Sequence, residues 1–202
     1  MSFMVVSMAT LNTPYENEAK IMSESADKFK LDNIVYAIPD LGDWTKNCAQ
    51  NAEVILEAME YYPEHDILFV DADATFEREP ILFNDYPFDF AISLMQYPGE
   101  KYPRHNTGTI WAKNNDKVKK FIREWQKLNE IDQCDSEYGE AWEQANLRKI
   151  LEGADINFGI LPDSYCWIFD NEIQARNKTE EPVIVHHQAS RRFKALINGR
   201  KK

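Results

Sequence analysis

The segment Ile67-Leu68-Phe69-Val70-Asp71-Ala72-Asp73 decides the fold of this chain. Its four apolar residues form a continuous run, which is typical of a strand that is buried on both faces of a parallel sheet. Two carboxylates follow one residue apart, and the alternation of an extended chain points Asp71 and Asp73 the same way. Ligands of open α/β sheets bind at the carboxyl ends of the strands. The segment therefore predicts a ligand site at the end of a central strand.

Upstream of this strand, β-rich runs alternate with helical patterns. Apolar runs predict strands over Phe3–Met8 and Asn33–Ile38, and helical spacing predicts helices over Pro14–Phe29 and Thr45–Tyr62. This alternation of strand and helix implies a mostly parallel central sheet that is covered by helices.

Downstream of the acidic pair the pattern is less regular. We expect further strands over 88–95, 109–112, 156–161 and 183–185, and helices over 118–128 and 138–151. The chain is then one α/β domain over 1–202. A nucleotide-binding half covers about 1–75, a donor-sugar and acceptor half covers about 76–190, and a basic tail covers 191–202.

The composition indicates an acidic globular protein with a basic end. Of 202 residues 44% are hydrophobic, and no apolar run approaches the roughly 18 residues of a membrane span. The formal net charge is −11, which disfavours general nucleic-acid binding. The last twelve residues hold six basic residues and no acid. We expect a solvated, frayed tail, where an anionic acceptor (a glycan, a lipid head group or nucleic acid) would be met.

The cysteines and the N-terminal residues suggest a compartment. Cys48, Cys134 and Cys166 are far apart and form no CxxC pair, which argues against a disulfide framework and a zinc site. We expect buried thiols in a reducing, cytoplasmic compartment. The apolar stretch at the N-terminus has no charged lead and no cleavage site, so it is interpreted as a first strand and not as a signal peptide.

The acidic pair itself predicts a cation site. Two like charges that converge at a strand end are costly unless a cation neutralises them, and oxygen ligands suit Mg²⁺ or Mn²⁺. A calcium loop is excluded because Phe76 and Leu82 occupy its glycine and glutamate positions. A second alternative stays open: the segment resembles the nucleophile motif of haloacid-dehalogenase phosphatases, with Asp71 as nucleophile and Asp73 as acid/base. That family carries the motif on its first strand, whereas here it follows the third.

Five short motifs are spread from about Val5 to Lys194. They are Ala9-Thr10-Leu11-Asn12 with Tyr15, Phe69-Val70-Asp71-Ala72-Asp73, Asn106-Thr107-Gly108-Thr109, Trp142-Glu143-Gln144-Ala145-Asn146-Leu147 and Val183-Ile184-Val185-His186-His187. Together they resemble the GT-A glycosyltransferases of the retaining, glycogenin-like and lipopolysaccharide-galactosyltransferase-like kind. The resemblance implies a GT-A-like, Rossmann-type sandwich that moves a sugar from a nucleotide-diphosphate donor, UDP-linked, with retention.

The resemblance also assigns roles to residues. It implies that Asp71, Asp73 and His186 bind Mn²⁺ or Mg²⁺, and that Glu143 and Gln144 act at the reaction centre. Neighbouring strand residues face opposite ways, so only one of His186 and His187 can be a ligand. The donor contacts that we expect are Thr10, Tyr15, Asp71, Ala72, Asp73, Asn106, Gly108 and Lys194. A basic residue of the tail, such as Lys194, would give the departing phosphate a second positive contact.

The chain also departs from the family pattern. Gln50 and Asn51 stand where the family often has a lysine, Glu143 replaces the usual aspartate, and 188–194 reads QASRRFK in place of a Gly-x-x-Lys-Pro-Trp pattern. These departures bear on the phosphate contacts and on the donor. A catalytically inactive sugar-nucleotide-binding scaffold is therefore a third alternative. Trp44 is a further candidate for ligand contact, while Trp111, Trp125 and Trp142 are expected in the core.

Overall fold

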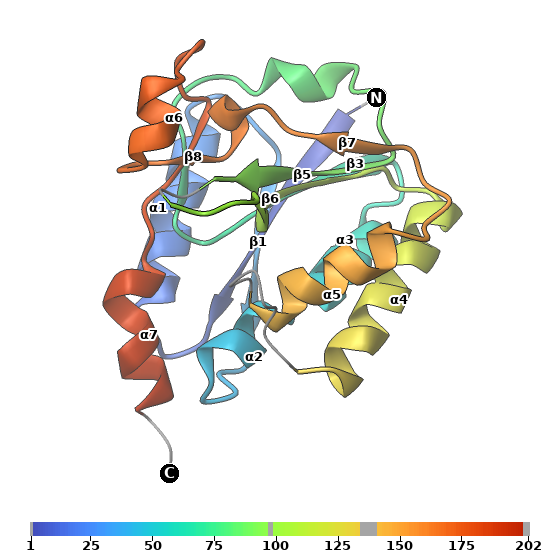
Figure 1. Cartoon of the computed structure of the whole chain (residues 1–202), viewed down its shortest axis with the longest axis horizontal. Helices are drawn as coiled ribbons and strands as arrows, with labels where there is room; N and C mark the ends of the chain where they lie inside the picture. The colour runs from blue at the N-terminus through green and yellow to red at the C-terminus, as the bar shows by residue number, and fades with distance from the viewer. Residues whose placement is uncertain (1, 97–98, 134–140, 200–202) are drawn as a thin grey trace.

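A computed structural model describes residues 2–96, 99–133 and 141–199 as an α/β sandwich (Figure 1). Within these residues the central sheet has six strands in the order β2-β1-β3-β6-β5-β7. Strand β1 is parallel to β2 and β3, and β5 is parallel to β7, whereas β6 runs antiparallel to both of its neighbours. The strands are β1 (Ser2–Thr10), β2 (Asn33–Ile38), β3 (His65–Val70), β5 (Phe90–Met95), β6 (Arg104–Ala112) and β7 (Phe158–Ile160). The expected mostly parallel sheet is confirmed.

Helices cover both faces of this sheet because the side chains of its central strand alternate. Leu68 and Val70 belong to a core cluster with helix α1 (Tyr15–Asp27) and the 3₁₀ helix η1 (Ile81–Asn84). Ile67 and Phe69 belong to the opposite cluster. That second cluster contains residues of α3 (Asn51–Tyr61), α4 (Asp116–Ile131) and α5 (Trp142–Leu151) (Figure 1). The buried run at 67–70 therefore anchors both layers.

A second, three-stranded sheet brings the last third of the chain back to the end of β3. Its order is β4-β9-β8, from β4 (Ala74–Phe76), β9 (Ile184–His186) and β8 (Trp167–Ile168). Ala74 pairs with His186, so the histidine lies directly beside the acidic segment. Between these strands lie η2 (Asp163–Tyr165) and α6 (Glu172–Arg176).

Two expected elements differ from those observed. The single helix expected over Thr45–Tyr62 is two helices, α2 (Trp44–Cys48) and α3. Asn47 explains the break, because its buried side chain accepts a hydrogen bond from Leu41 N and donates one to Asp40 Oδ1, which fastens α2 to the preceding loop. The strand expected over 109–112 is longer than predicted. Strand β6 begins at Arg104, because it continues to pair with β5 beyond a bulge at Ile92 and Ser93.

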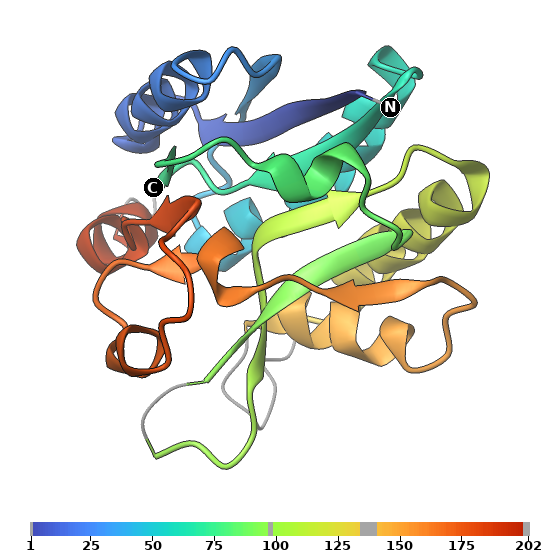
Figure 2. The same cartoon turned by 90° about the horizontal axis from the view of Figure 1, so that it is seen from above.

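The expectation of a frayed basic tail is wrong for residues 190–198. They form helix α7 (Ser190–Asn198), which contacts α2 and buries Ile197. Figure 2 shows α7 at the side of the sheet where β1 and β3 end. Residues 200–202 of that tail lie outside the described residues, as does Cys134. Within the described part of the chain, no helix has the length and apolar character that crossing a membrane requires.

Candidate functional site

A pocket of about 220 Å³ opens at the carboxyl ends of β1, β2 and β3. The returning segments of the chain close its other side. It is lined by Met8, Thr10, Tyr15, Ile38, Trp44, Asn47, Cys48, Asp71, Ala72, Asp73, Asn106, Gln144, Ile168, His186, Gln188 and Ser190. The ligand site expected after the central strand is thus a real cavity.

Asp71 and Asp73 are held at the floor of this pocket by the backbone around them. The N–H of Asp71 donates to Gly108 O (2.8 Å), and the N–H of Ala74 donates to Asp71 O (3.0 Å), which forms a tight turn. The Asp73 side chain is buried, and its Oδ2 accepts a hydrogen bond from Ala189 N (2.6 Å). The Asp71 carboxylate remains accessible from the pocket.

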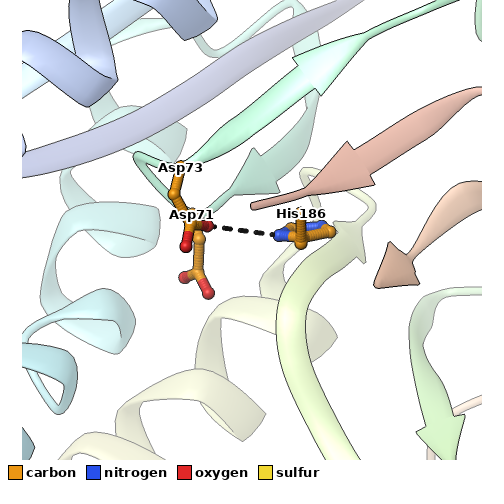
Figure 3. A group of neighbouring side chains, drawn as sticks. All are labelled: Asp71, Asp73 and His186. Atoms are coloured by element: carbon orange, nitrogen blue, oxygen red, sulfur yellow. Dashed lines mark ion pairs between the residues drawn. The ribbon is translucent and has the colours of Figure 1, made fainter. Parts of the chain in front are cut away.

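His186 faces both carboxylates from β9 (Figure 3). Its Nδ1 lies 3.6 Å from Asp73 Oδ1, and its Nε2 lies 2.9 Å from Thr109 Oγ1. One ligand atom from each of Asp71, Asp73 and His186 lies within 4.8 Å of the others. His187 is exposed on the opposite face, where its Nε2 lies 2.9 Å from Thr75 Oγ1. The structure therefore brings His186, and not His187, to the two acids.

The electrostatics of these groups suit a cation. Loss of hydration at the pocket floor and then the charge of Asp73 raise the pKa of Asp71 to about 7, and His186 opposes that rise. Burial alone would raise the pKa of Asp73, but hydrogen bonds with His186 and Ala189 N hold it below its usual value. Burial alone would lower the pKa of His186, but Cys166 and Asp73 hold it well above its usual range. The acids thus already attract positive charge.

The turn Asn106–Gly108 packs directly against this group. Asn106 lines the pocket, and its Oδ1 accepts a hydrogen bond from Gly108 N (2.8 Å). A Cβ at Gly108 would lie 2.9 Å from Asn106 Oδ1, 3.1 Å from His186 Cε1 and 3.2 Å from Asp71 Oδ2. Glycine at this position therefore lets β6 approach the acids and the histidine.

Two aromatic side chains, Tyr15 and Trp44, also line the pocket. The Trp44 indole N–H donates to Tyr15 Oη (3.0 Å), and the Lys194 ammonium lies 4.3 Å from the centre of the Trp44 ring. Burial raises the pKa of Tyr15, so its hydroxyl stays protonated. Thr10 shares a hydrogen bond with Thr13 (2.8 Å between the Oγ1 atoms). Lys194 therefore covers Trp44, while Thr10, Tyr15 and Trp44 line the cavity itself.

The two predicted catalytic residues of α5 lie differently. Gln144 lines the pocket, and its Nε2 donates to Thr107 Oγ1 (3.3 Å). The Glu143 side chain is buried, and its carbonyl accepts a hydrogen bond from the Trp125 indole (2.8 Å). Burial and then the charge of Glu143 raise the pKa of the Cys48 thiol well above its usual range. Cys48 lines the pocket, whereas Glu143 does not. Trp111, Trp125 and Trp142 are buried, as expected.

Sequence reasoning missed the backbone donor at Ala189 and the lining residues Met8 and Ile38. Met8 and Ile38 stand near the ends of predicted strands, which is a signal that finds them. The Ala189 N–H reaches Asp73 because Gln188 adopts a left-handed backbone (φ 53°). Glutamine has no preference for that conformation, so no sequence signal marks this contact.

The comparisons with known proteins concern most of the chain. A family model described as nucleotide-diphospho-sugar transferase matches residues 63–194, more than half of the chain. No curated protein sequence matches. A solved glycosyltransferase involved in the glycosylation of the major capsid of PBCV-1 is similar at a TM-score of 0.71 and 14% identity, with 98% of each chain covered. The apo-form glycosyltransferase GlyE of Streptococcus pneumoniae TIGR4 is similar at a TM-score of 0.62 and 14% identity. The match covers 93% of this chain and 54% of the GlyE chain.

Proposed function

Because this chain belongs to the nucleotide-diphospho-sugar transferase family and is a glycosyltransferase, we propose that it uses a divalent metal and a UDP-linked donor, with retention at the anomeric carbon. The observation that carries the proposal is the convergence of Asp71, Asp73 and His186 in one pocket at the carboxyl edge of the sheet. The family match favours sugar transfer over the phosphatase that the acidic motif also resembles.

The three side chains fit a divalent cation. Two carboxylates and an imidazole are a suitable donor set for Mn²⁺ or Mg²⁺, and the Thr109 hydroxyl beside His186 Nε2 leaves Nδ1 directed at the acids. When bound, the metal supplies positive charge that stabilises the departing diphosphate. Asp73 also accepts a hydrogen bond from Ala189 N, in the returning segment Ile184–Asn198. The same carboxylate therefore connects the three proposed metal ligands to the segment that closes the pocket.

Other residues of the pocket then bind the remaining parts of the donor. Thr10, Tyr15 and Trp44 form the end that suits a nucleobase, because it offers aromatic surface and hydroxyl groups. Lys194 is the cation that we assign to the diphosphate. Asn106 lies next to the acids and suits the donor sugar.

Retention follows in this proposal from attack on the face that the diphosphate leaves. The acceptor hydroxyl oxygen bonds to the anomeric carbon, the bond to the diphosphate breaks, and the departing phosphate oxygen takes the hydroxyl proton. Gln144 holds its amide at the pocket wall through Thr107, where it would stabilise the oxocarbenium-like centre. Glu143, buried next to Gln144 on α5, would act on the same centre.

The test is a thermal-shift screen of UDP-, GDP-, CMP- and dTDP-sugars with and without Mn²⁺. A ligand at about 100 times its Kd stabilises a protein by about 2.7 kcal/mol, which such a screen resolves. We expect a shift that needs both Mn²⁺ and a UDP-sugar and that Asp73→Ala abolishes. Asp85→Ala, an exposed acid outside the pocket, is the matched control and should keep the shift.

The outcomes separate the alternatives. A manganese-independent shift, or none with any nucleotide, contradicts the proposal. A shift without release of UDP toward any acceptor identifies an inactive scaffold. A phosphorylated Asp71 after incubation with a phosphate ester identifies the phosphatase. Proton NMR of the first glycoside formed distinguishes retention from inversion.

A further inference from the structure

Cys166 is a fully buried thiol next to two side chains of the site. It lies between η2 and β8, and its exposed fraction is 0%. Its Sγ is 3.6 Å from Asn106 Oδ1, within reach of an S–H hydrogen bond, and it also interacts with the His186 ring. None of the motifs of the sequence includes it, and the proposed reaction does not use it.

The contacts of Asn106 fix the direction of its amide. Its Oδ1 accepts a hydrogen bond from Gly108 N (2.8 Å), and only the carbonyl oxygen of an amide can accept from an N–H group. The Cys166 S–H donates to the same oxygen. With both donors on Oδ1, the Nδ2 group is left for the pocket that Asn106 lines. Among the residues that the structure describes, none accepts a hydrogen bond from Nδ2.

The thiol is itself held in place from α6. The buried Gln174 side chain donates from Nε2 to Cys166 O (3.0 Å) and accepts at Oε1 from Ile168 N (2.8 Å). This amide clamps the backbone on both sides of Trp167. The position of the sulfur is therefore set by the fold and does not depend on a ligand.

We propose that Cys166 is a positioning residue of the donor site. Its S–H holds the Asn106 amide so that Nδ2 is presented to the oxygens of a metal-bound nucleoside diphosphate or its sugar. The inference rests on the proposed function for the identity of the ligand. The arrangement of Cys166, Asn106 and Gly108 is independent of it.

The test measures UDP binding by calorimetry at saturating Mn²⁺. Cys166→Ala removes one neutral hydrogen bond, so the Kd for UDP should rise about threefold to tenfold. Cys166→Ser keeps a donor and should recover most of that loss. In an Asn106→Ala background, Cys166→Ala should add nothing further, because the thiol acts through the amide.

One control variant separates positioning from simple loss of stability. Ile122→Val trims a buried side chain of α4, outside the pocket, and should lower the melting temperature while leaving the Kd for UDP unchanged. Cys166→Ala with a wild-type Kd, or with the same loss in the Asn106→Ala background, overturns the proposal.

Crystal structures of metal-free wild type and Cys166→Ala provide a readout without nucleotide. We expect the Asn106 side chain in one rotamer in the wild type and in a different or second rotamer in the variant. The same single rotamer in both overturns the inference. If the wild type fails to bind UDP with Mn²⁺, the proposed function fails, and these two structures still decide the role of Cys166.

Discussion

Two regions of the molecule meet at the pocket, and they are held in different ways. The acids follow β3, whose residues Asp66–Val70 are all buried and which pairs with β1 and β6. The returning segment Ile184–Asn198 supplies His186 and the Ala189 N–H. Its helix α7 buries only Ile197. The first region is therefore part of the core, whereas helix α7 of the second region lies on the surface.

The difference predicts different stabilities for the two regions. Backbone hydrogen bonds in a buried sheet open only when the whole domain unfolds, whereas a helix with few buried contacts opens at a lower free energy. Helix α7 is attached through Trp44 N to Asn198 Oδ1 (2.8 Å) and through the Phe193 ring against Tyr15 (5.7 Å between centroids). We infer that the acids contribute most to metal binding, with His186 completing the group, and that helix α7 decides how tightly the nucleotide is kept.

The largest expected effect comes from Asp71→Asn. The substitution removes one of the proposed metal ligands, so the Kd for Mn²⁺ should rise about 100-fold or more. It also removes a negative charge that is repelled by the charge of Asp73, so the metal-free protein should melt at a slightly higher temperature. Calorimetry with Mn²⁺ and thermal unfolding in EDTA measure the two effects.

Asp73→Ala should act in the opposite direction on stability. It removes the acceptor of Ala189 N, so the metal-free protein should melt at a lower temperature while metal binding is also lost. A lower melting temperature for Asp71→Asn, matching that of Asp73→Ala, would show that the two acids do not differ as described.

Stability and Mn²⁺ affinity should depend on pH in opposite directions. The pKa of Asp71 is about 7 in the folded protein against 3.8 ordinarily, so its contribution to stability is present at low pH and is lost as the pH rises from about 4 through 7. His186, whose pKa is also raised, adds a loss in the same direction. Metal binding needs both groups deprotonated, so Mn²⁺ affinity should rise about tenfold or more from pH 6 to 7. Unfolding in EDTA and Mn²⁺ titration over that range test both signs, and flat profiles would contradict them.

Gly108→Ala should have the next largest effect. The new Cβ would press on Asn106 Oδ1 at 2.9 Å and on His186 Cε1 at 3.1 Å, which separates the histidine from the acids. We expect the Kd for Mn²⁺ with UDP to rise about tenfold. Gly153→Ala is the control, because a Cβ there meets nothing within 4 Å. Equal affinities for the two variants would mean that β6 does not need to approach the site closely.

The sequence predicted the strand-end region well because burial on both faces leaves a continuous apolar run. The layers and the acids follow from period-2 and period-3.6 patterns, whereas the choice of His186 over His187 came from the resemblance to the GT-A glycosyltransferases. The short strands β4 and β8 contain three and two residues, which is too few for a period to be visible. Both strands form because they pair with β9 of the returning segment, one on each side.

The returning helix was missed for a different reason. Basic residues at 191, 192 and 194 made the tail resemble a solvated end, yet Phe193 and Ile197 are four residues apart, as an amphipathic helix requires. The left-handed Gln188 that aims Ala189 at Asp73 is a tertiary effect without a local signal. The roles of Glu143, Gln144 and Lys194 stay predictions, because their positions alone do not test them.

Phe193→Ala should have a moderate effect that is confined to the returning segment. Loss of the ring contact with Tyr15 should speed amide hydrogen exchange over 188–198 and leave β1 and β3 unchanged. The Kd for UDP should rise about threefold to tenfold. Leu196→Ala, on the same helix but 47% exposed, is the matched control. Exchange that also accelerates in β3 would mean that the two regions unfold together.

The smallest expected effect comes from Arg192→Ala. Arg192 and Glu18 lie 3.1 Å apart and join α7 to α1, but the arginine side chain is 54% exposed. Exposed pairs contribute about 0.2–1 kcal/mol and are weakened by salt. We expect the free energy of unfolding at low salt to fall by an amount in this range. The fall should be smaller at 0.5 M salt, because salt screens the ion pair. A change in UDP affinity as large as that of Phe193→Ala, insensitive to salt, would show that the ion pair and not the aromatic contact holds the returning helix over the pocket.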